Sequence, residues 1–200
     1  MKDAPLPDSE VWGQSFELTN GLRYLIEAPS GKGKSTFLGL LYGTRSAASG
    51  EILWNDEKIN SWNDERWSAI RREKVSMLFQ EMRLFDMLTV RQNLQMKIEL
   101  TNHVSIETAV NWLDELGLNG FLDRECRTLS YGQQQRVAIV RALCQPFEWL
   151  LLDEPFSHLD QENALRAMAL IDRIRDPKSG VIITSLGQAD DRMFDRLLRL

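Results

Sequence analysis

The stretch EAPSGKGKST, residues 27–36, decides the fold. It matches the phosphate-binding loop pattern G-x-x-x-x-G-K-[ST], except that Ala28 takes the place of the first glycine. The apolar run LRYLIEA at residues 22–28 predicts a strand before the loop, and KSTFLGLLYG predicts a helix that begins at Lys34 and is closed by Gly43. This order of strand, loop and helix is the context that a phosphate-binding loop requires.

The loop offers the chemistry that a nucleotide needs. Successive backbone amides at residues 30–35 can wrap a β-phosphate, and the helix N-terminus adds its partial positive charge. Lys34 would reach the β- and γ-phosphates, and the Ser35 hydroxyl would ligate Mg²⁺. Ala28 contributes no phosphate donor, and the two later glycines are retained. The predicted binding set is Ser30, Gly31, Lys32, Gly33, Lys34, Ser35 and Thr36. A chance Gly/Lys/Ser loop is the alternative, which the flanking elements disfavour.

Strands and helices alternate along the chain. An antiparallel hairpin is expected from SFEL and LRYLIEA around Asn20-Gly21. Further strands are expected at residues 50–54, 75–79, 148–155, 180–185 and 195–200. Helices are expected at residues 64–73 with Asp64 as a cap, at 89–100, at 105–117 with Ser105 before an acidic turn, at 131–144 and at 161–175. This order predicts an α/β fold with a mostly parallel sheet and helices on both faces.

Composition indicates an ordinary globular chain. Two hundred residues suit one domain, with 43% hydrophobic and 26% charged residues. The net charge of -5 gives no argument for nucleic acid or for an anionic membrane as a partner. No apolar run reaches the ~18 residues that span a bilayer, and residues 1–10 resemble a loose lead-in rather than a signal peptide. We therefore expect a cytoplasmic chain. Cys126 and Cys144 match no metal or disulfide spacing and are expected to be reduced thiols.

Two acidic residues end the apolar segment LLLDEP. Open α/β sheets hold ligands at the carboxyl ends of their strands, which is where Asp153 and Glu154 fall. Asp153 suits Mg²⁺, through water, and Glu154 suits the task of polarising an attacking water. The alternative is a pair of solvated, idle acids, which is less expected beside a phosphate loop.

A third motif, LSYGQQQR at residues 129–136, opens a predicted helix. Its Ser-x-Gly offers amides and a hydroxyl to an anion. The same residues also make an ordinary N-terminal cap, with Ser130 as the capping residue and Gln133 three positions later. Local chemistry alone favours the cap.

The motifs APSGKGKST, LSYGQQQR, LLLDEP and SHLD, in that order and spacing, resemble the ATP-binding cassette ATPases, the nucleotide-binding subunits of ABC transporters. The resemblance extends over residues 16–198. It implies a P-loop NTPase of one domain, 1–200, with a RecA-like core and β element at 11–80 and 129–200 and a helical subdomain at 81–128. It also implies a head-to-tail homodimer with two ATP molecules between the subunits. Ser130, Gly132 and Gln133 of one subunit would then face the phosphate loop of the other.

The resemblance also assigns roles to single residues. Gln80, in MLFQEMRLF, matches the glutamine that senses Mg²⁺ and the γ-phosphate, and Asp160 matches an aspartate that touches the opposite subunit. The implied catalytic set is Glu154, Gln80 and Lys34, and the implied metal set is Ser35, Gln80 and Asp153. The helical subdomain would receive a coupling helix from a membrane partner. Residues 49–94 resemble more closely the small cassettes of the lipoprotein-releasing, macrolide-efflux and cell-division type.

The sequence departs from the family pattern at several positions. Tyr131 replaces the first glycine of the usual Ser-Gly-Gly. Ser185 stands where the family has a histidine that contacts the γ-phosphate, and a serine cannot carry a cation. The two histidines, His103 and His158, lie elsewhere. Trp12 is the candidate for an aromatic that stacks on adenine, and core packing is its alternative role. We expect ATP binding with Mg²⁺ and slow hydrolysis.

Two kinds of function are consistent with the resemblance. The first is an ATP-binding and ATP-hydrolysing subunit, peripheral at the inner face of the membrane, that powers a separate integral membrane subunit through ATP-dependent dimerisation. The second is a soluble non-transport cassette ATPase, or an ATP-binding module with weak or no hydrolysis. Translation-type cassettes usually come in pairs and repair-type cassettes carry long coiled coils, and this chain has neither.

Overall fold

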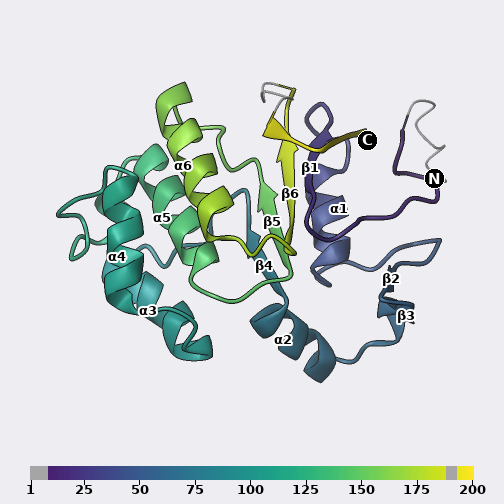
Figure 1. Ribbon diagram of the computed structural model, residues 1–200, viewed down its shortest axis with the longest axis horizontal. Helices are drawn as coiled ribbons and strands as arrows, with labels where there is room; N and C mark the ends of the chain where they lie inside the picture. The colour runs from purple at the N-terminus through teal and green to yellow at the C-terminus, as the bar shows by residue number, and fades with distance from the viewer. Residues whose placement is uncertain (1–8, 188–192) are drawn as a thin grey trace.

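A five-stranded parallel sheet forms the centre of the computed structural model, which describes residues 9–187 and 193–200 (Figure 1). The lead-in expected at residues 1–10 therefore lies mostly outside the described residues. The strand order is β4-β5-β6-β1-β7, and every neighbouring pair is parallel. The strands are β1 (Arg23–Glu27), β4 (Val75–Leu78), β5 (Trp149–Asp153), β6 (Gly180–Ser185) and β7 (Arg196–Arg199).

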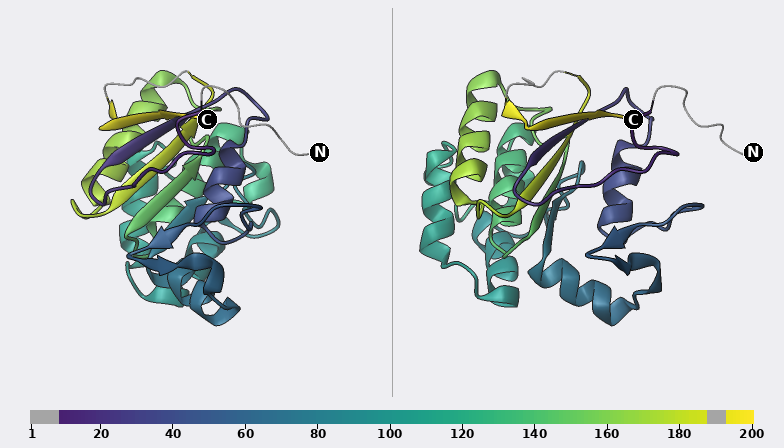
Figure 2. Two further views of the ribbon diagram at one scale, coloured as in Figure 1. Left: turned by 90° about the vertical axis from the view of Figure 1, so that its right-hand side faces the viewer. Right: turned by 45° about the vertical axis from the view of Figure 1, so that its right-hand side comes forward.

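Six α-helices cover the two faces of this sheet, as the alternating pattern predicts. Helices α3 to α6 lie on one side, and α1 and α2 lie on the other (Figures 1 and 2). The helices are α1 (Lys34–Leu41), α2 (Asp64–Glu73), α3 (Val90–Thr101), α4 (Ile106–Glu115), α5 (Tyr131–Leu143) and α6 (Gln161–Ile174).

The strands place alternate side chains into two separate cores, because successive residues of a strand point to opposite faces. In β1, Leu25 joins the cluster beneath α3 to α6, whereas Tyr24 and Ile26 join the cluster beneath α1 and α2. In β6, Ile182 faces the second cluster and its neighbours face the first. A sheet buried on both sides explains why these strands read as continuous apolar runs.

The small antiparallel element lies at a different place from the expected hairpin. Residues 15–18 form no strand, and β1 pairs in parallel with β6 and β7. The antiparallel pair consists instead of β2 (Leu53–Trp54) and β3 (Glu57–Lys58). Gly21, with φ 84°, does make the turn that Asn20-Gly21 predicts. After this turn the chain enters the middle of the sheet rather than folding back on itself, so the general fold class is confirmed and the hairpin is wrong.

Helix termini match the sequence-based expectations closely, with one correction. Asn63, not Asp64, caps α2, because its side chain accepts a hydrogen bond from the Arg66 amide. Ser105 caps α4 as expected. Short 3₁₀ turns occupy Ile59–Ser61 and Cys126–Thr128. Within the described part of the chain, we find no helix with the length and apolar character needed to cross a membrane.

Candidate functional site

The phosphate-binding loop joins the end of β1 to the start of α1, beside the carboxyl ends of β5 and β6 (Figure 1). Gly31 and Gly33 have φ angles of 77° and 97°, a left-handed conformation that glycine adopts without steric cost. Ala28 lies at the end of the strand with its methyl group buried, and its amide bonds to the Ser185 carbonyl (3.4 Å). Ala28 is therefore accommodated by the sheet.

The first backbone amides of α1 lack the side-chain acceptor that usually caps the start of a helix. Its first intrahelical bond runs from the Phe37 amide to the Gly33 carbonyl (2.8 Å), so the three amides before Phe37 need an acceptor from outside the helix. Among the described residues, no side chain caps this helix. The other five α-helices all have a side-chain cap. The loop residues Ser30, Gly31, Lys32 and Ser35 are exposed, and Gly33 and Thr36 are half-buried.

Lys34 is buried at the centre of the loop. Its ammonium group donates to the carbonyls of Ala28 (2.8 Å) and Pro29 (3.3 Å). It also forms an ion pair with Glu154 Oε1 at 3.2 Å, in which the two side chains are only 6% and 10% exposed. Two residues that the sequence predicts to be catalytic, 120 positions apart, thus meet in one desolvated place.

The acidic pair at the end of β5 is organised by Thr184, which sequence reasoning missed. Its hydroxyl donates to Asp153 Oδ1 (2.7 Å) and accepts from the Glu154 amide (3.0 Å). Thr184 and Asp153 are partners in the register between β5 and β6 and are both buried. One oxygen of Asp153 is therefore oriented by a hydroxyl group, and the other is left for a further ligand.

Glu154 occupies a strained backbone conformation. Its φ of 49° is uncommon for a residue other than glycine, asparagine or aspartate, and such residues cost about 1–3 kcal/mol unless the surroundings hold them. Gln135, a buried residue of α5, holds it by donating to the Glu154 carbonyl (3.0 Å). The side-chain oxygen of Gln135 accepts a second hydrogen bond, from the backbone amide of His158 (3.1 Å). Gln135 therefore joins α5 to the segment that carries Glu154, a role that the sequence does not indicate.

The start of α5 is closed by its own side chains. Ser130 Oγ accepts from the Gln133 amide (3.3 Å), and Gln133 Oε1 accepts from the Ser130 amide (2.9 Å), which is the predicted capping box. A Cβ at Gly132 would lie 2.7 Å from the His158 carbonyl oxygen, so only glycine fits there. Tyr131, by contrast, is exposed and lies edge-on against the His158 ring, with centroids 4.2 Å apart. Tyr131, which replaces the first glycine of the Ser-Gly-Gly pattern, thus stands at a position where a large side chain fits.

The two ends of the predicted site stay separate within one chain. In the part of the chain that the structure describes, no hydrogen bond or ion pair joins Ser130, Gly132 or Gln133 to the phosphate loop. Gln80 comes shortly after β4 and is exposed. Met82 and Arg83, close behind it, have left-handed φ angles of 58° and 51°.

Trp12 lies against the phosphate loop. Its indole is about 3.2 Å from where a Cβ of Gly33 would stand, and it packs edge-on against Phe37 at 6.2 Å. Trp12 is half-buried, so it packs against the loop and also presents part of its ring beside the phosphate site. Ser185, at the position of the expected histidine, ends β6 and is half-buried.

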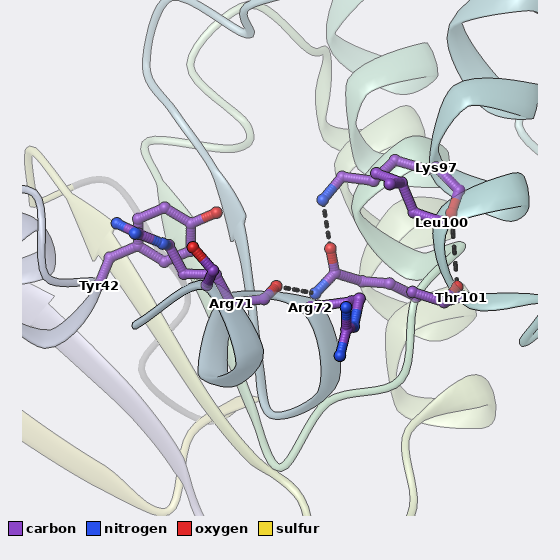
Figure 3. Close-up of a pocket in the computed structure, with 8 residues that line it drawn as sticks. Tyr42, Arg71, Arg72, Lys97, Leu100 and Thr101 are labelled. Atoms are coloured by element: carbon purple, nitrogen blue, oxygen red, sulfur yellow. Dashed lines mark hydrogen bonds between the residues drawn. The ribbon is translucent and has the colours of Figure 1, made fainter. Parts of the chain in front are cut away.

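A cleft of about 360 Å³ lies between α2 and α3 (Figure 3). Gln145 bridges its floor, because its amide donates to the Arg71 carbonyl (2.9 Å) and accepts from Lys97. Burial lowers the pKa of Lys97. The cleft is lined by Tyr42, Ser68, Arg71, Arg72, Lys97, Leu100, Thr101 and Gln145.

Both cysteines are free thiols in the core. Burial raises the pKa of Cys126 to about 11 and that of Cys144 to about 12. Each thiol stays protonated near neutral pH and is unreactive.

Comparison with known proteins agrees with this geometry. The ABC transporter family model matches residues 12–157. A thiamine import ATP-binding protein, ThiQ, from Haemophilus influenzae (strain 86-028NP) is 43% identical over 164 residues, which cover 79% of this chain and 72% of the relative. A phosphonates import ATP-binding protein, PhnC 2, from Synechococcus sp. (strain JA-2-3B'a(2-13)) is 33% identical over 196 residues, which cover 92% and 72%.

Solved structures show the same architecture. The ATP-binding cassette MJ0796, described as a dimer in a post-hydrolysis state bound to ADP and Pi, superposes with a TM-score of 0.83. The sequence identity is 27%, and the match covers 92% of this chain and 83% of that one. The cassette cbiO1 from Clostridium perfringens matches with a TM-score of 0.73 at 25% identity, over 92% and 75% of the two chains.

Proposed function

The chain belongs to the ABC transporter family as an ATP-binding, ATP-hydrolysing subunit, and we propose that its catalytic centre is the buried meeting point of Lys34, Glu154 and Asp153. One observation carries this proposal: Lys34 Nζ lies 3.2 Å from Glu154 Oε1, at the N-terminus of α1, which no side chain in the described structure caps. The same lysine that would hold phosphate thus neutralises the predicted base until a nucleotide arrives.

ATP binds across the start of α1. The amides of Lys34, Ser35 and Thr36, which no side chain in the described structure caps, point toward its phosphates, and the helix dipole favours their negative charge. The Lys34 ammonium exchanges its contact with Glu154 for the β- and γ-phosphates. Trp12, beside Gly33, supplies an aromatic surface to the adenine.

Mg²⁺ fits the donor set at this point. The described residues contain no group of three or more His, Cys, Asp or Glu side chains that could cage a metal by themselves. Mg²⁺ usually takes one or two carboxylates together with substrate phosphates and waters, and Asp153 and the Ser35 hydroxyl match that need. Gln80 would approach from the end of β4. When bound, the ion would neutralise charge that develops on the phosphate oxygens.

Hydrolysis requires a base that is free to accept a proton once ATP is bound. With Lys34 on the phosphates, the Glu154 carboxylate accepts a proton from a water aimed at the γ-phosphorus. Thr184 and Gln135 hold the strained backbone of Glu154 from its amide and its carbonyl. Because Ser185 cannot supply the cation that a histidine would, we propose slow turnover.

The motif at the start of α5 acts on a second copy of the chain. Its residues Ser130, Gly132 and Gln133 form no hydrogen bond or ion pair with the phosphate loop of their own chain in the described structure, and the solved relative is a dimer. We place them on the γ-phosphate of the ATP held by the partner subunit, with Asp160 at the same interface. The domain division proposed from the sequence, a core at 11–80 and 129–200 and a helical subdomain at 81–128, accommodates this arrangement.

A separate integral membrane subunit completes the transporter, and the chain works at the inner face of the membrane through it. The cleft between α2 and α3 is the place we propose for a segment of that partner (Figure 3). The resemblance to lipoprotein-releasing, macrolide-efflux and cell-division cassettes stays a prediction.

Steady-state ATP turnover of the purified chain, with Mg²⁺, tests the centre. We expect Glu154→Gln to lower kcat by about 10²-fold or more, because removing a positioned base typically costs 10²–10⁴. Ser185→His should raise kcat. The matched control is Glu162→Gln, which changes an exposed carboxylate of α6 that pairs with Arg166. Turnover unaffected by Glu154→Gln would exclude this residue as the base.

A further inference from the structure

The chain makes an unusual turn just after Gln80. Met82 and Arg83 both have left-handed backbone, with φ of 58° and 51°, although neither is of the residue types that adopt it readily. The Met82 side chain is buried among the residues beneath α3 to α6. The turn therefore cannot relax by moving that side chain into solvent, and something must hold the backbone in place.

Arg141, in the last turn of α5, holds it. Its Nη2 donates to the Met82 carbonyl (2.6 Å), and its Nη1 donates to the Arg83 carbonyl (2.8 Å). A planar guanidinium suits two acceptors set side by side, which a lysine ammonium cannot match with the same geometry. Burial lowers the pKa of Arg141, yet an arginine keeps its charge. The two carbonyls therefore replace the hydrogen bonds that the buried guanidinium no longer makes to water.

Phe79, the residue before Gln80, is also fixed by side-chain contacts. The Arg83 guanidinium lies 3.7 Å from the centre of the Phe79 ring, a cation–π contact, and Phe79 packs edge-on against Tyr42 at 5.5 Å. The residues before and after Gln80 are thus fixed, while Gln80 itself is exposed. This arrangement presents the Gln80 side chain on a turn that is held from both sides.

We propose that Arg141 is a positioning residue that fixes Gln80 relative to α5, by clamping the carbonyls of Met82 and Arg83. Helix α5 is 13 residues long and spans about 20 Å at 1.5 Å per residue. Ser130 caps the first turn of α5, and Arg141 lies in its last turn. A displacement of the helix at Ser130 would therefore be passed through Arg141 to the turn after Gln80. The inference rests on the proposed function only for what Gln80 does, and not for the clamp.

Hydrogen exchange tests the clamp without any catalytic readout. Arg141→Met keeps the length and apolar stem but removes both donors. We expect the amide of Met82, bonded to the Phe79 carbonyl at 2.8 Å, to exchange about tenfold faster or more. The control is Arg136→Met. Arg136 is the other arginine of α5, and it donates to the Gly132 and Leu116 carbonyls and to Asn163, so its loss should leave the exchange of residues 79–85 unchanged. Unchanged exchange in Arg141→Met would overturn the proposal.

Turnover then tests whether the clamp acts through Gln80. We expect Arg141→Met to lower kcat about tenfold with a KM for ATP changed less than about threefold. In a Gln80→Ala background the same substitution should have no further effect, because two residues that act as one unit are not additive. Additive losses would overturn the proposal.

Two further outcomes separate this proposal from the proposed function. If Arg141→Met does not fold, Arg141→Lys replaces it, and this variant should recover part of the protection and part of the turnover. Turnover that is insensitive to Gln80→Ala would contradict the proposed role of Gln80, while the exchange result would still decide on the clamp.

Discussion

Helices α1 and α5 both begin with a small-residue motif suited to an anion, but their first turns are built in opposite ways. The N-cap residue of α1 is Gly33, and no side chain in the described structure satisfies the first amides of this helix. The N-cap residue of α5 is Ser130, and a complete capping box satisfies the Ser130 and Gln133 amides. Only the amides of its first two residues are left to point outward.

From this difference we infer which of the two helix ends binds a nucleotide by itself. An uncapped N-terminus with a buried lysine is complete as a phosphate site within one chain. A self-capped N-terminus is already stable without a ligand, and it carries no lysine. We therefore expect α1 to set the affinity of a single chain for ATP and α5 to act only when a second chain brings a nucleotide to it.

The largest effect is expected at α1. Lys34→Met should weaken ATP binding more than about hundredfold, because hydrogen bonds to charged groups contribute about 1.5–3 kcal/mol each and this ammonium makes more than one. Isothermal titration calorimetry with Mg-free and Mg-containing ATP measures it. An ATP affinity that is retained in Lys34→Met would contradict the comparison of α1 with α5, because the site would then not depend on the lysine that distinguishes α1.

A stability effect accompanies this substitution and needs its own control. Without Lys34, the Glu154 carboxylate, which is only 10% exposed, loses the partner of its buried ion pair. Removal of one partner of a buried ion pair costs about 3–5 kcal/mol. The double variant Lys34→Met/Glu154→Gln should recover most of the free energy of unfolding in urea while its ATP affinity stays low.

An intermediate effect is expected at Gly132. A methyl group there would meet the His158 carbonyl at 2.7 Å, and backbone cannot move away as cheaply as a side chain. Gly132→Ala should lower the free energy of unfolding by about 1–3 kcal/mol, the usual cost of overpacking. Tyr131→Gly is the matched neighbour, because its exposed ring fills no tight space. Urea unfolding that ranks these two variants the other way would contradict the packing at the start of α5.

Much of this site could be predicted because its signals are local. A glycine-rich loop between a strand and a helix, two acids at a strand end and a Ser-x-x-Gln cap all lie within a few residues of sequence. Thr184 could not be predicted in this way. It lies 31 residues from Asp153, and the two meet only because β5 and β6 pair in one particular register.

The hairpin prediction failed for a related reason. The turn at Asn20-Gly21 is real, but the sheet decides where the chain goes after the turn, because β1 has β6 on one side and β7 on the other. A Cβ at Gly21 would lie 2.9 Å from the Pro177 carbonyl, so this glycine also serves a close approach between distant segments. Local turn chemistry indicates where a chain bends but not which strand it joins afterwards. Gln135 and Arg141 escape prediction equally, because each bonds to backbone atoms of a distant segment.

The smallest effect is expected at Ser130, and it is the sharpest test of the comparison. Ser130→Ala removes the cap of α5 and should lower the free energy of unfolding by about 1 kcal/mol, the usual contribution of a serine cap. Ser105→Ala removes the equivalent hydroxyl from α4, which accepts from the Thr108 amide (3.2 Å), and should cost about the same. The affinity of one chain for ATP should stay within about twofold of the original in both variants, because neither hydroxyl lies at α1. Turnover under dimer-forming conditions should fall for Ser130→Ala alone. Equal turnover in the two variants would mean that the Ser130 hydroxyl is a helix cap and nothing more, and that α5 meets the partner's nucleotide through its backbone amides only.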